Sequence, residues 1–482
     1  MARKYITTSI VYTNTPSHIG FALELVQADA IARFWRAQGH DVRFGTGTDE
    51  HGTNIYRAAQ SRGIPTQDFV DEIAGKVKDL ADKLNISYNQ FVRTSDRVHH
   101  WPAAEKLWRA MVASDDLYKK KYEGLYCIGH EAFIRPSDLI DGKCSLHGKE
   151  PELVSEENWF FKITKYRNQV RELIESGKME IVPSSRKDEL LNLLTDIEDI
   201  SFSRPSGQLP WGIPAPNDPM QTMYVWADAL TNYLSGLGYG TDDAQMDFWP
   251  ADIHLVGKDI VRFHAIIWPA MSLSAGLKIP RRIAVHGFIT VDGKKMSKTM
   301  GNVIDPFDIL AKWPTDVVRY FLLREIQSAD DSDFSSGRLK ERYEGELANG
   351  LGNLVQRVAV LLTGAGDRMH QEGNLEATEA SLALVLDDNS HNEAFESFRL
   401  HDVVGAIWEK IGIANAYINA KEPWKQDDAT RANTLAVLVE MIRHIAVLLV
   451  PIMPETAEKI AKLYSSEIKK APGLLFPKDI VE

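Results

Sequence analysis

The sequence predicts an α/β fold, a doubly wound parallel sheet that is interrupted by an insertion and followed by a C-terminal helical bundle. Three observations carry this prediction. The first hundred residues alternate β-branched stretches with stretches of helical period, which is typical of a parallel sheet covered by helices. The middle of the chain is irregular and polar and holds both cysteines. Beyond about residue 324 strong strand patterns end and helical patterns continue.

The composition is that of a globular protein. The 482 residues correspond to about three domains at roughly 150 residues each. Hydrophobic residues make up 44% and charged residues 25%, which excludes a disordered chain. Two cysteines are too few for a disulfide scaffold. The net charge of −12 argues against coating nucleic acid by bulk charge, although a local basic groove remains compatible with it.

The N-terminal region predicts a β-α-β unit. Residues 5–11 are short and β-branched and indicate a buried strand. Residues 23–35 carry apolar side chains at helical spacing, and residues 42–46 are again strand-like. This order predicts a ligand crevice at the carboxyl ends of the strands.

The insertion begins near residues 119–121 and closes in a stretch punctuated by Pro205, Pro210, Pro214 and Pro216. Strand candidates return at residues 223–226, 254–257 and 283–286.

The apolar stretch at residues 435–453 is interrupted by Glu440, Arg443 and Pro451, so it predicts a packed helix and not a membrane span. No apolar signal-peptide core follows the N-terminus. We therefore expect a cytoplasmic chain. The helix should bury one face, made of Leu435, Leu438, Met441, Ile442, Ile445 and Leu449.

The first candidate motif lies between the first strand and the first helix and runs from Pro16 to Phe21. A helix start presents free N–H groups and a positive end, which suits a phosphate. His18 would donate to a phosphate oxygen, and Gly20 would let a ligand approach the backbone. By itself, a histidine in a turn is more often a surface or capping residue.

The second candidate motif, at residues 292–302, is rich in glycine, lysine and serine and follows a strand. A mobile loop with lysines can follow the charge that develops on a leaving phosphate. A solvated basic loop explains the pattern equally well when it is taken alone. The chain has neither a P-loop nor a G-x-G-x-x-G fingerprint.

Together, His18-Ile19-Gly20-Phe21 and Lys295-Met296-Ser297-Lys298-Thr299 resemble the HIGH and KMSKS signatures of class I aminoacyl-tRNA synthetases. Residues 46–52, 224–230 and 257–270 make the chain similar to the methionyl-tRNA synthetases of that class, over nearly its whole length. The resemblance implies a class I, Rossmann-like sheet that activates methionine with ATP, giving methionyl-adenylate and pyrophosphate. Methionine then passes to the 3′-terminal adenosine of tRNA(Met).

The same resemblance implies the domains. Residues 1–118 and 217–324 would be the halves of the catalytic nucleotide-binding domain. Residues 119–216 would be a connective insertion with a small knuckle, and residues 325–482 an α-helical anticodon-binding domain.

The resemblance also implies the substrate sites. The catalytic residues would be His18, Lys295 and Lys298. The ATP-binding residues would be His18, Gly20, Phe21, Lys295, Ser297, Lys298 and Thr299. The methionine-binding residues would be Ser9, Ile10, Tyr12, Asp49, Trp226, Ala229, Tyr233, Ile260 and His264.

Physical chemistry supports the methionine site, because aromatic walls hold a flexible thioether well. Asp49 would receive the substrate ammonium. Without the resemblance, the aromatic residues of this set would be taken as core.

Two positions depart from the signatures. Phe21 replaces the last histidine of HIGH, so one phosphate donor is missing, although backbone N–H groups would remain. Thr299 replaces the last serine of KMSKS and keeps the hydroxyl. Mg²⁺ would accompany ATP.

Two C-x-x-H pairs lie in the insertion. Cys127, His130, Cys144 and His147 form a plausible tetrahedral set for a structural zinc ion. The alternative is a degenerate knuckle that binds no metal. A disulfide between the cysteines is disfavoured in a reducing cytosol.

The helical part carries a candidate anticodon site. Asn353 and Arg357 are four apart and share a helix face, and Trp424 follows Pro423 at a loop-to-helix junction. All three match anticodon-reading positions of the family, with side chains suited to unstacked bases. The alternative is an ordinary polar pair and a core tryptophan.

Two rival functions follow from the same residues. A leucine-, valine- or isoleucine-specific relative would need a large editing domain, for which residues 121–216 are too few. A catalytically silent, synthetase-like RNA-binding protein is motivated by Phe21 alone and opposed by Lys295, Ser297 and Lys298. Since no appended C-terminal domain is visible, we expect a monomer whose partners are methionine, ATP and tRNA(Met).

Overall fold

The computed structural model resolves two compact units. It describes residues 1–14, 18–127, 132–134, 139–144, 148–291, 293–296, 302–363, 380–465 and 473–478. The first unit comprises Met1–Ser17, Gly39–Asp82 and Ser87–Val285. The second comprises His18–Gln38, Lys83–Ile86 and His286–Glu482.

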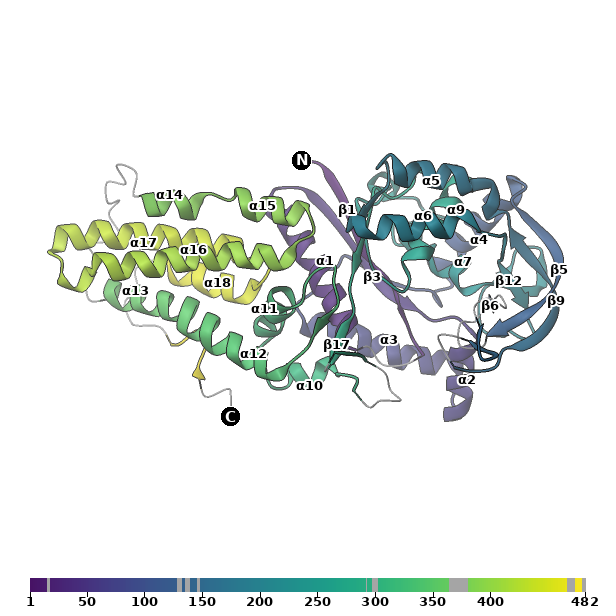
Figure 1. Ribbon diagram of the computed structural model, residues 1–482, viewed down its shortest axis with the longest axis horizontal. Helices are drawn as coiled ribbons and strands as arrows, with labels where there is room; N and C mark the ends of the chain where they lie inside the picture. Colours follow the sequence, from purple (N-terminus) through teal and green to yellow (C-terminus); the bar gives the residue numbers. More distant parts are fainter. Residues whose placement is uncertain are drawn as a thin grey trace. The chain divides into compact units, whose positions relative to one another are not determined.

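The first unit is built on a seven-stranded sheet with the order β10-β16-β15-β1-β3-β2, in which β4 also pairs with β3. Figure 1 labels its strands β1 and β3. The strands are β1 (Arg3–Thr8), β2 (Val11–Tyr12), β3 (Asp41–Asp49), β4 (Gln90–Arg93), β10 (Glu180–Val182), β15 (Ile253–Gly257) and β16 (Arg282–His286). Strand β1 runs parallel to both neighbours, with Thr7 opposite Gly45 and His254. The predicted doubly wound parallel sheet is thus confirmed.

Helices cover this sheet. They are α2 (Thr53–Arg62), α3 (Thr66–Lys83), α4 (His100–Ala113), α5 (Arg167–Glu175), α6 (Lys187–Thr195), α7 (Val225–Ala229), α8 (Asn232–Ser235), the π-helix η5 (Phe263–Ile267) and α9 (Trp268–Ser274). In α4 the apolar residues recur at helical spacing, so that Leu107, Trp108 and Met111 are all buried. They join one large core cluster with Phe202 and Trp268.

The insertion contributes a separate antiparallel sheet. It consists of β5 (Leu117–Cys127), β6 (Ala132–Ile134), β9 (Glu152–Phe161) and β11 (Ile200–Ser201). Between β9 and β11 the chain forms α5, β10 and α6, and β10 pairs in parallel with β16 of the main sheet. The range 119–216 therefore contains an edge strand of the main sheet. This strand, β10, has only three residues, which is too short for a sequence pattern to reveal.

One strand expectation was wrong. Residues 223–226 do not form a strand of the main sheet. Met223 ends β14 (Asp218–Met223), which pairs antiparallel with β12 (Ser203–Pro205) and β13 (Pro214–Ala215), and Val225 begins α7. A four-residue run of aromatic and β-branched side chains carries no period that separates strand from buried helix.

The second unit is mainly helical. Its helices are α1 (Ile19–Ala37), α10 (Pro306–Leu310), α11 (Thr315–Glu325), α12 (Ser336–Arg342), the π-helix η7 (Tyr343–Gly352), α13 (Asn353–Thr363), α14 (Ala380–Leu386), α15 (Asn389–Glu396), α16 (Leu400–Lys421), η9 (Pro423–Lys425), α17 (Asp428–Leu449) and α18 (Pro454–Leu463). A small sheet joins β17 (Ile289–Val291), β18 (Lys294–Lys295) and β19 (Ser332–Asp333). The predicted C-terminal helical bundle is confirmed.

Helix α17 is central to this bundle. The six residues predicted to share its apolar face are all buried, and the helix packs on α13, α14, α16 and α18 (Figure 1). Among the described helices it is the one that is long and apolar enough to cross a membrane, and 56% of the apolar window is buried inside the protein. Its packing on four helices is that of a core helix.

A fully buried arginine joins four segments of the second unit. The Arg319 guanidinium, on α11, donates to the carbonyl oxygens of Leu84, Pro451 and Ile452 at 2.9–3.0 Å. It also pairs with Asp29 of α1 at 2.7 Å. The planar fork of arginine satisfies all four acceptors at once, which a lysine ammonium with three N–H groups does not.

We expect Arg319→Met to destabilise the protein by about 3–5 kcal/mol, because it leaves a buried carboxylate and three buried carbonyls without this donor. The measurement is urea unfolding followed by far-UV circular dichroism. Arg109→Met is the control, because Arg109 is exposed and pairs with Glu105 on the same helix; its midpoint should change little. Equal midpoints for the two variants would contradict the role of Arg319.

Candidate active site

The carboxyl ends of β1, β2 and β3 bring the first predicted methionine-site residues together. Tyr12 lies opposite Asp49 in the parallel pairing of β2 with β3. The backbone N–H and the hydroxyl of Thr13 both donate to the Asp49 carbonyl, at 2.9 and 3.0 Å. The Ser9 N–H donates to Leu255 of β15. Asp49 is 7% exposed at the very end of its strand.

The aromatic wall comes from α7, α8 and η5. Trp226 of α7 stacks on Phe263, with ring centroids 3.7 Å apart and planes 6° from parallel. His264 meets the Trp226 ring edge-on at 6.0 Å. Its Nε2 lies 2.6 Å from the Tyr233 hydroxyl. The predicted residues Trp226, Tyr233 and His264 therefore form one cluster.

Hydrogen bonds fix the tautomer of His264. Its Nδ1 lies 3.0 Å from the carbonyl oxygen of Ile260, which only accepts, so Nδ1 carries a proton. In the neutral ring Nε2 then accepts from the Tyr233 hydroxyl. With a neutral imidazole, the Tyr233 hydroxyl is therefore the donor to His264.

His254 lies behind this cluster and is fully buried. Trp268 Nε1 donates to its Nε2 at 3.2 Å, and its Nδ1 lies 2.7 Å from the Thr7 hydroxyl. Burial, with a smaller contribution from the charge of His264, lowers the pKa of His254 well below 6.5. The ring beneath Tyr233, at 4.1 Å between centroids, is therefore uncharged at neutral pH.

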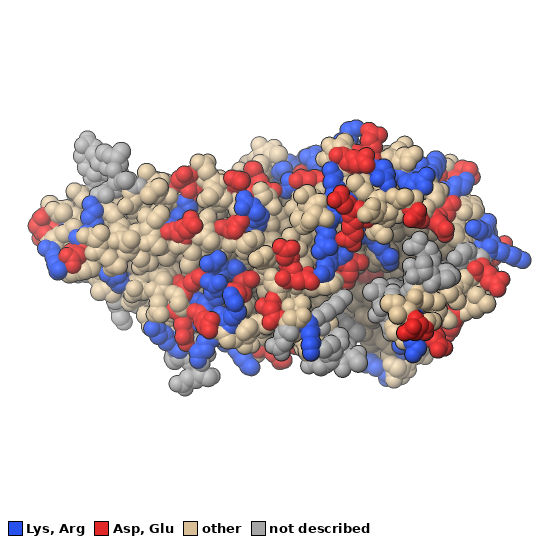
Figure 2. All heavy atoms as spheres, in the orientation of Figure 1, with Lys and Arg blue, Asp and Glu red and all other residues tan. Residues whose placement is uncertain are grey.

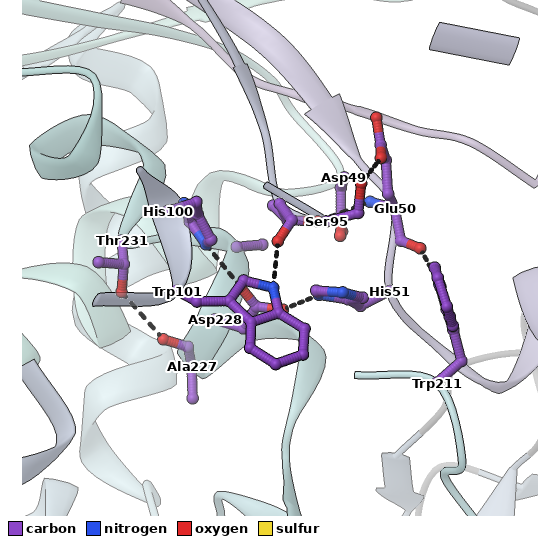
Figure 3. A network of polar contacts seen from close by, with 12 residues as sticks. Asp49, Glu50, His51, Ser95, His100, Trp101, Trp211, Ala227, Asp228 and Thr231 are labelled. Atoms are coloured by element: carbon purple, nitrogen blue, oxygen red, sulfur yellow. Dashed lines mark hydrogen bonds and ion pairs between the residues drawn. The ribbon is translucent and has the colours of Figure 1, made fainter. Parts of the chain in front are cut away.

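A buried acid–base cluster adjoins the same segments (Figure 3). Asp228 of α7 accepts from His51 Nδ1 at 2.5 Å and from His100 Nε2 at 2.7 Å. Burial by itself raises the pKa of Asp228, but the two imidazoles outweigh it and the pKa is lowered. His100 Nδ1 lies 2.9 Å from the Ser235 hydroxyl.

Glu50 lies between Asp49 and His51 in the chain, and its carboxylate is bound by residues other than Asp228, His51 and His100. Arg93 of β4 holds both of its carboxylate oxygens, at 2.7 and 2.9 Å. The hydroxyls of Thr48 and Ser95 donate to the same carboxylate. The neighbouring side chains of Glu50 and His51 are thus fixed by different partners.

In the second unit His18 caps α1. Its Nδ1 accepts from the Gly20 N–H at 3.0 Å, so that Nε2 carries the proton of the neutral ring. A Cβ at position 20 would lie 2.8 Å from the His18 ring, so glycine is needed here to accommodate the histidine.

The expectation of free N–H groups at this helix start was wrong for the described structure. The Ile19 N–H donates to Ile304, and those of Phe21 and Ala22 donate to the His18 carbonyl. The Phe21 side chain is buried, with 6% exposed. The His18 side chain itself is exposed.

The second motif is described only in part. Lys294 and Lys295 form β18, which pairs with β17 in a hairpin whose Gly293 N–H donates to Asp333. Ser297, Lys298 and Thr299 lie outside the described residues.

The cysteines of the predicted knuckle are both buried and share one small cluster with Ile134. They come from β5 and from β8 (Lys143–Cys144), which pairs with β7 (Leu139–Ile140). His130 and His147 lie outside the described residues.

The structure also brings together two of the three predicted anticodon residues. The Arg357 guanidinium of α13 lies over the Trp424 ring at 5.5 Å and donates to Asn419 at 3.0 Å. Trp424 is 47% exposed, and Asn353 is exposed one turn before Arg357. Trp424 is therefore not a core residue, which was the alternative interpretation of the sequence.

Sequence reasoning gave no role to several residues of the site. Phe263, His254 and the Asp228 cluster were not singled out. Asp228 and His51 lie within quoted motifs, but they are 177 positions apart and only the fold shows that they meet.

Comparison with known proteins agrees with this geometry. The family model for class I tRNA synthetases (M) matches residues 4–135 and 129–359, and that for the anticodon-binding domain of tRNA ligases matches residues 389–478. These matches and the parallel sheet define a class I tRNA synthetase.

Full-length relatives are more specific. Methionine–tRNA ligase of Clostridium acetobutylicum is 40% identical over 96% of this chain and 73% of its own length. That of Brucella melitensis is 37% identical over 97% and 92%. A Mycobacterium tuberculosis methionyl-tRNA synthetase, solved with methionyl-adenylate, has a TM-score of 0.91 and 36% identity over 99% of this chain and 100% of that one. The chain belongs to the methionyl-tRNA synthetases.

We expect the neutral His254 to make folding stability fall with acidification below about pH 6.5. The unfolded chain takes up a proton there that the folded chain does not, so stability is lost as pH falls through the unfolded pKa. His254→Gln should lower the slope between pH 6.5 and 5 by up to about 1.4 kcal/mol per pH unit. Urea midpoints at pH 7, 6 and 5 measure the slope. Identical slopes would mean that His254 takes up its proton in the folded protein as well.

Proposed function

We propose that this chain activates methionine with ATP to methionyl-adenylate and pyrophosphate, and transfers methionine to the 3′-terminal adenosine of tRNA(Met). One observation carries the proposal most directly. The Tyr233–His264 pair and the Trp226 wall form a polarisable aromatic cluster in a family member 36% identical to a synthetase solved with methionyl-adenylate.

Methionine binding follows from the chemistry of this cluster. The Asp49 carboxylate at the end of β3 would receive the ammonium. Ser9, Ile10, Ala229 and Ile260 would complete the site, and the thioether would lie against the aromatic wall, where sulfur–ring contacts contribute about 0.3–1.5 kcal/mol each. Because burial keeps His254 uncharged at neutral pH, this ring adds no competing cation beneath Tyr233.

Adenylation needs positioning and charge stabilisation more than covalent help from the enzyme. A methionine carboxylate oxygen attacks the α-phosphorus of ATP, and pyrophosphate leaves. His18 would donate from Nε2 to a phosphate oxygen. Lys295, Ser297, Lys298 and Thr299 would supply the remaining donors, each worth about 3 kcal/mol when well placed. Mg²⁺ would be bound with ATP as part of the substrate.

The second step transfers the aminoacyl group. A terminal ribose hydroxyl of the tRNA attacks the carbonyl carbon of the adenylate and gives its proton to the departing phosphate, and AMP leaves with the bonding electron pair. Asn353, Arg357 and Trp424 would hold the anticodon on the helical unit, with Trp424 as the stacking surface.

We also propose a structural zinc ion held by Cys127, His130, Cys144 and His147. The burial of both cysteines in one cluster supports this set, since thiolates with imidazoles are the ligands that tetrahedral zinc prefers. The ion would fix the hairpin β7–β8 against β5 and take no part in the reaction.

We further propose that the chain works as a monomer in the cytoplasm, where its substrates occur. Figure 2 shows lysine and arginine interspersed with aspartate and glutamate over the face drawn, a surface suited to a chain that stays apart from its copies. Buried cysteines suit a reducing compartment.

We expect methionine-dependent ATP–pyrophosphate exchange from the purified protein, with leucine and isoleucine inactive. Tyr233→Phe should raise the methionine KM about tenfold, or about 1.4 kcal/mol, because a buried imidazole nitrogen loses its donor. The KM for ATP should stay within about twofold. Absence of exchange from folded protein with Mg²⁺ present would favour the silent RNA-binding function.

We expect Trp424→Ala to lower aminoacylation kcat/KM for tRNA(Met) at least about tenfold, since a stacked base contributes about 1–3 kcal/mol. Pyrophosphate exchange, which needs no tRNA, should be unchanged. Val447→Ala serves as the control, because Val447 is a similarly exposed apolar residue on α17. Equal losses in both assays would mean that Trp424 supports folding and not anticodon binding.

A further inference from the structure

We propose that Asp228 is a positioning residue for methionine: it ties the turn that carries Asp49 to the helix that carries Trp226 and Ala229, and so sets methionine affinity. The inference rests on the proposed function, since it takes these three residues as methionine contacts. It adds a residue that touches none of the substrate but holds both sides of the site.

Asp228 is placed to do this by its position in the chain. It lies on α7, two residues after Trp226 and directly before Ala229, and it is 1% exposed. Its Oδ2 accepts from His51, two residues after Asp49 (Figure 3). One buried carboxylate therefore joins the two segments that would face the ammonium and the side chain of methionine.

The second imidazole extends the connection to α4 and α8. His100, at the start of α4, donates from Nε2 to Oδ1 of Asp228. Its Nδ1 lies beside the Ser235 hydroxyl of α8, two residues after Tyr233. The segments carrying Asp49 and Trp226 thus meet at one carboxylate, and His100 connects the segment carrying Tyr233 to it.

The geometry permits little movement. His51 is held edge-on by Trp101 at 6.0 Å and by Trp211 at 5.8 Å. Trp211 in turn donates to the Glu50 carbonyl. The carboxylate can only accept, so both imidazoles must donate to it, and any shift of α7 would break a buried charge-assisted hydrogen bond.

This rigidity matters for affinity because the ammonium and the thioether are bound by different segments. If either segment is displaced by a fraction of an ångström, methionine cannot make its ammonium contact and its side-chain contact at full strength together. We call Asp228 and its hydrogen bonds to His51 and His100 the clamp. Loss of the clamp should therefore raise the methionine KM, whereas ATP binding and the chemical step change much less.

The test is Asp228→Asn in methionine-dependent exchange. An amide can accept from one imidazole, but it presents N–H to the other, which must change tautomer or lose its bond. We expect the methionine KM to rise about tenfold, with kcat and the ATP KM within about threefold. Equal increases in both KM values, or an unchanged methionine KM, would overturn the proposal.

Asp116→Asn is the matched control. Asp116 is another fully buried carboxylate of the first unit, and its partners are Tyr166, Ser274 and Lys165. This variant should lower the Tm and leave the methionine KM unchanged. A rise equal to that of Asp228→Asn would mean that general destabilisation explains the effect, and would overturn the proposal.

Two variants of His100 test its hydrogen bond to Asp228 directly, and they can be used if Asp228→Asn fails to fold. His100→Gln keeps an N–H near the position of Nε2, whereas His100→Leu removes it. We expect the glutamine variant to keep a methionine KM near that of the wild type and the leucine variant to show the increase. Equal values for the two would overturn the proposal.

If the proposed function is wrong, the wild type will show no methionine-dependent ATP–pyrophosphate exchange. The clamp is then tested by calorimetry, as the methionine Kd of the wild type and of Asp228→Asn. A tenfold weaker Kd in the variant supports the clamp, and equal values, or no binding of methionine by the wild type, overturn it.

Discussion

The parallel pairing of β1 with β3 on one side and β15 on the other is the constraint on which the site depends. Since parallel strands end at the same edge, this pairing gathers Ser9, Asp49 and the turn after Gly257 from segments up to 250 residues apart. The π-helix that follows that turn presents Phe263 and His264 to Trp226. A shift of β2 by one residue would turn all of its side chains to the opposite face and would separate Tyr12 from Asp49.

Buried charges fix the geometry that the sheet only approximates. Each is shared among several elements: Glu50 among β3 and β4, Asp228 among the β3 turn, α4 and α7, and Arg319 among α1, α11 and the turn before α18. A buried ion with its full set of partners has one arrangement of low free energy, because every displacement exposes an unsatisfied group in a medium of low dielectric constant. Hydrophobic packing tolerates small shifts more readily. Precision at the site therefore derives from these polar clusters.

Sequence patterns predicted what is local and missed what is not. The alternation of β-branched and helical stretches gave the sheet, and the apolar period of α17 gave the bundle, because both depend on neighbours within a few residues. The anticodon and methionine residues came from the family resemblance. Their types alone would have suggested core for the aromatic residues and an ordinary polar pair for Asn353 and Arg357. Residues 223–226 were assigned to a strand because their propensity is that of strands, and tertiary packing made half of them helical. No local pattern could show that Asp228 meets His51 and His100.

The position of Phe21 in the fold explains why the motif has no second histidine. Its side chain lies in the first turn of α1 and is buried, with 6% exposed, and the N–H groups of residues 19–22 are all bound within the protein. A histidine at this position would have to bury an imidazole or leave the core, at a cost that a phosphate contact would need to offset. The phosphate donor proposed for this turn is the imidazole of His18, which the Gly20 N–H orients. The proposed phosphate site rests on that ring and on Lys295 and Lys298, and the absence of the last histidine of the motif is compatible with adenylation.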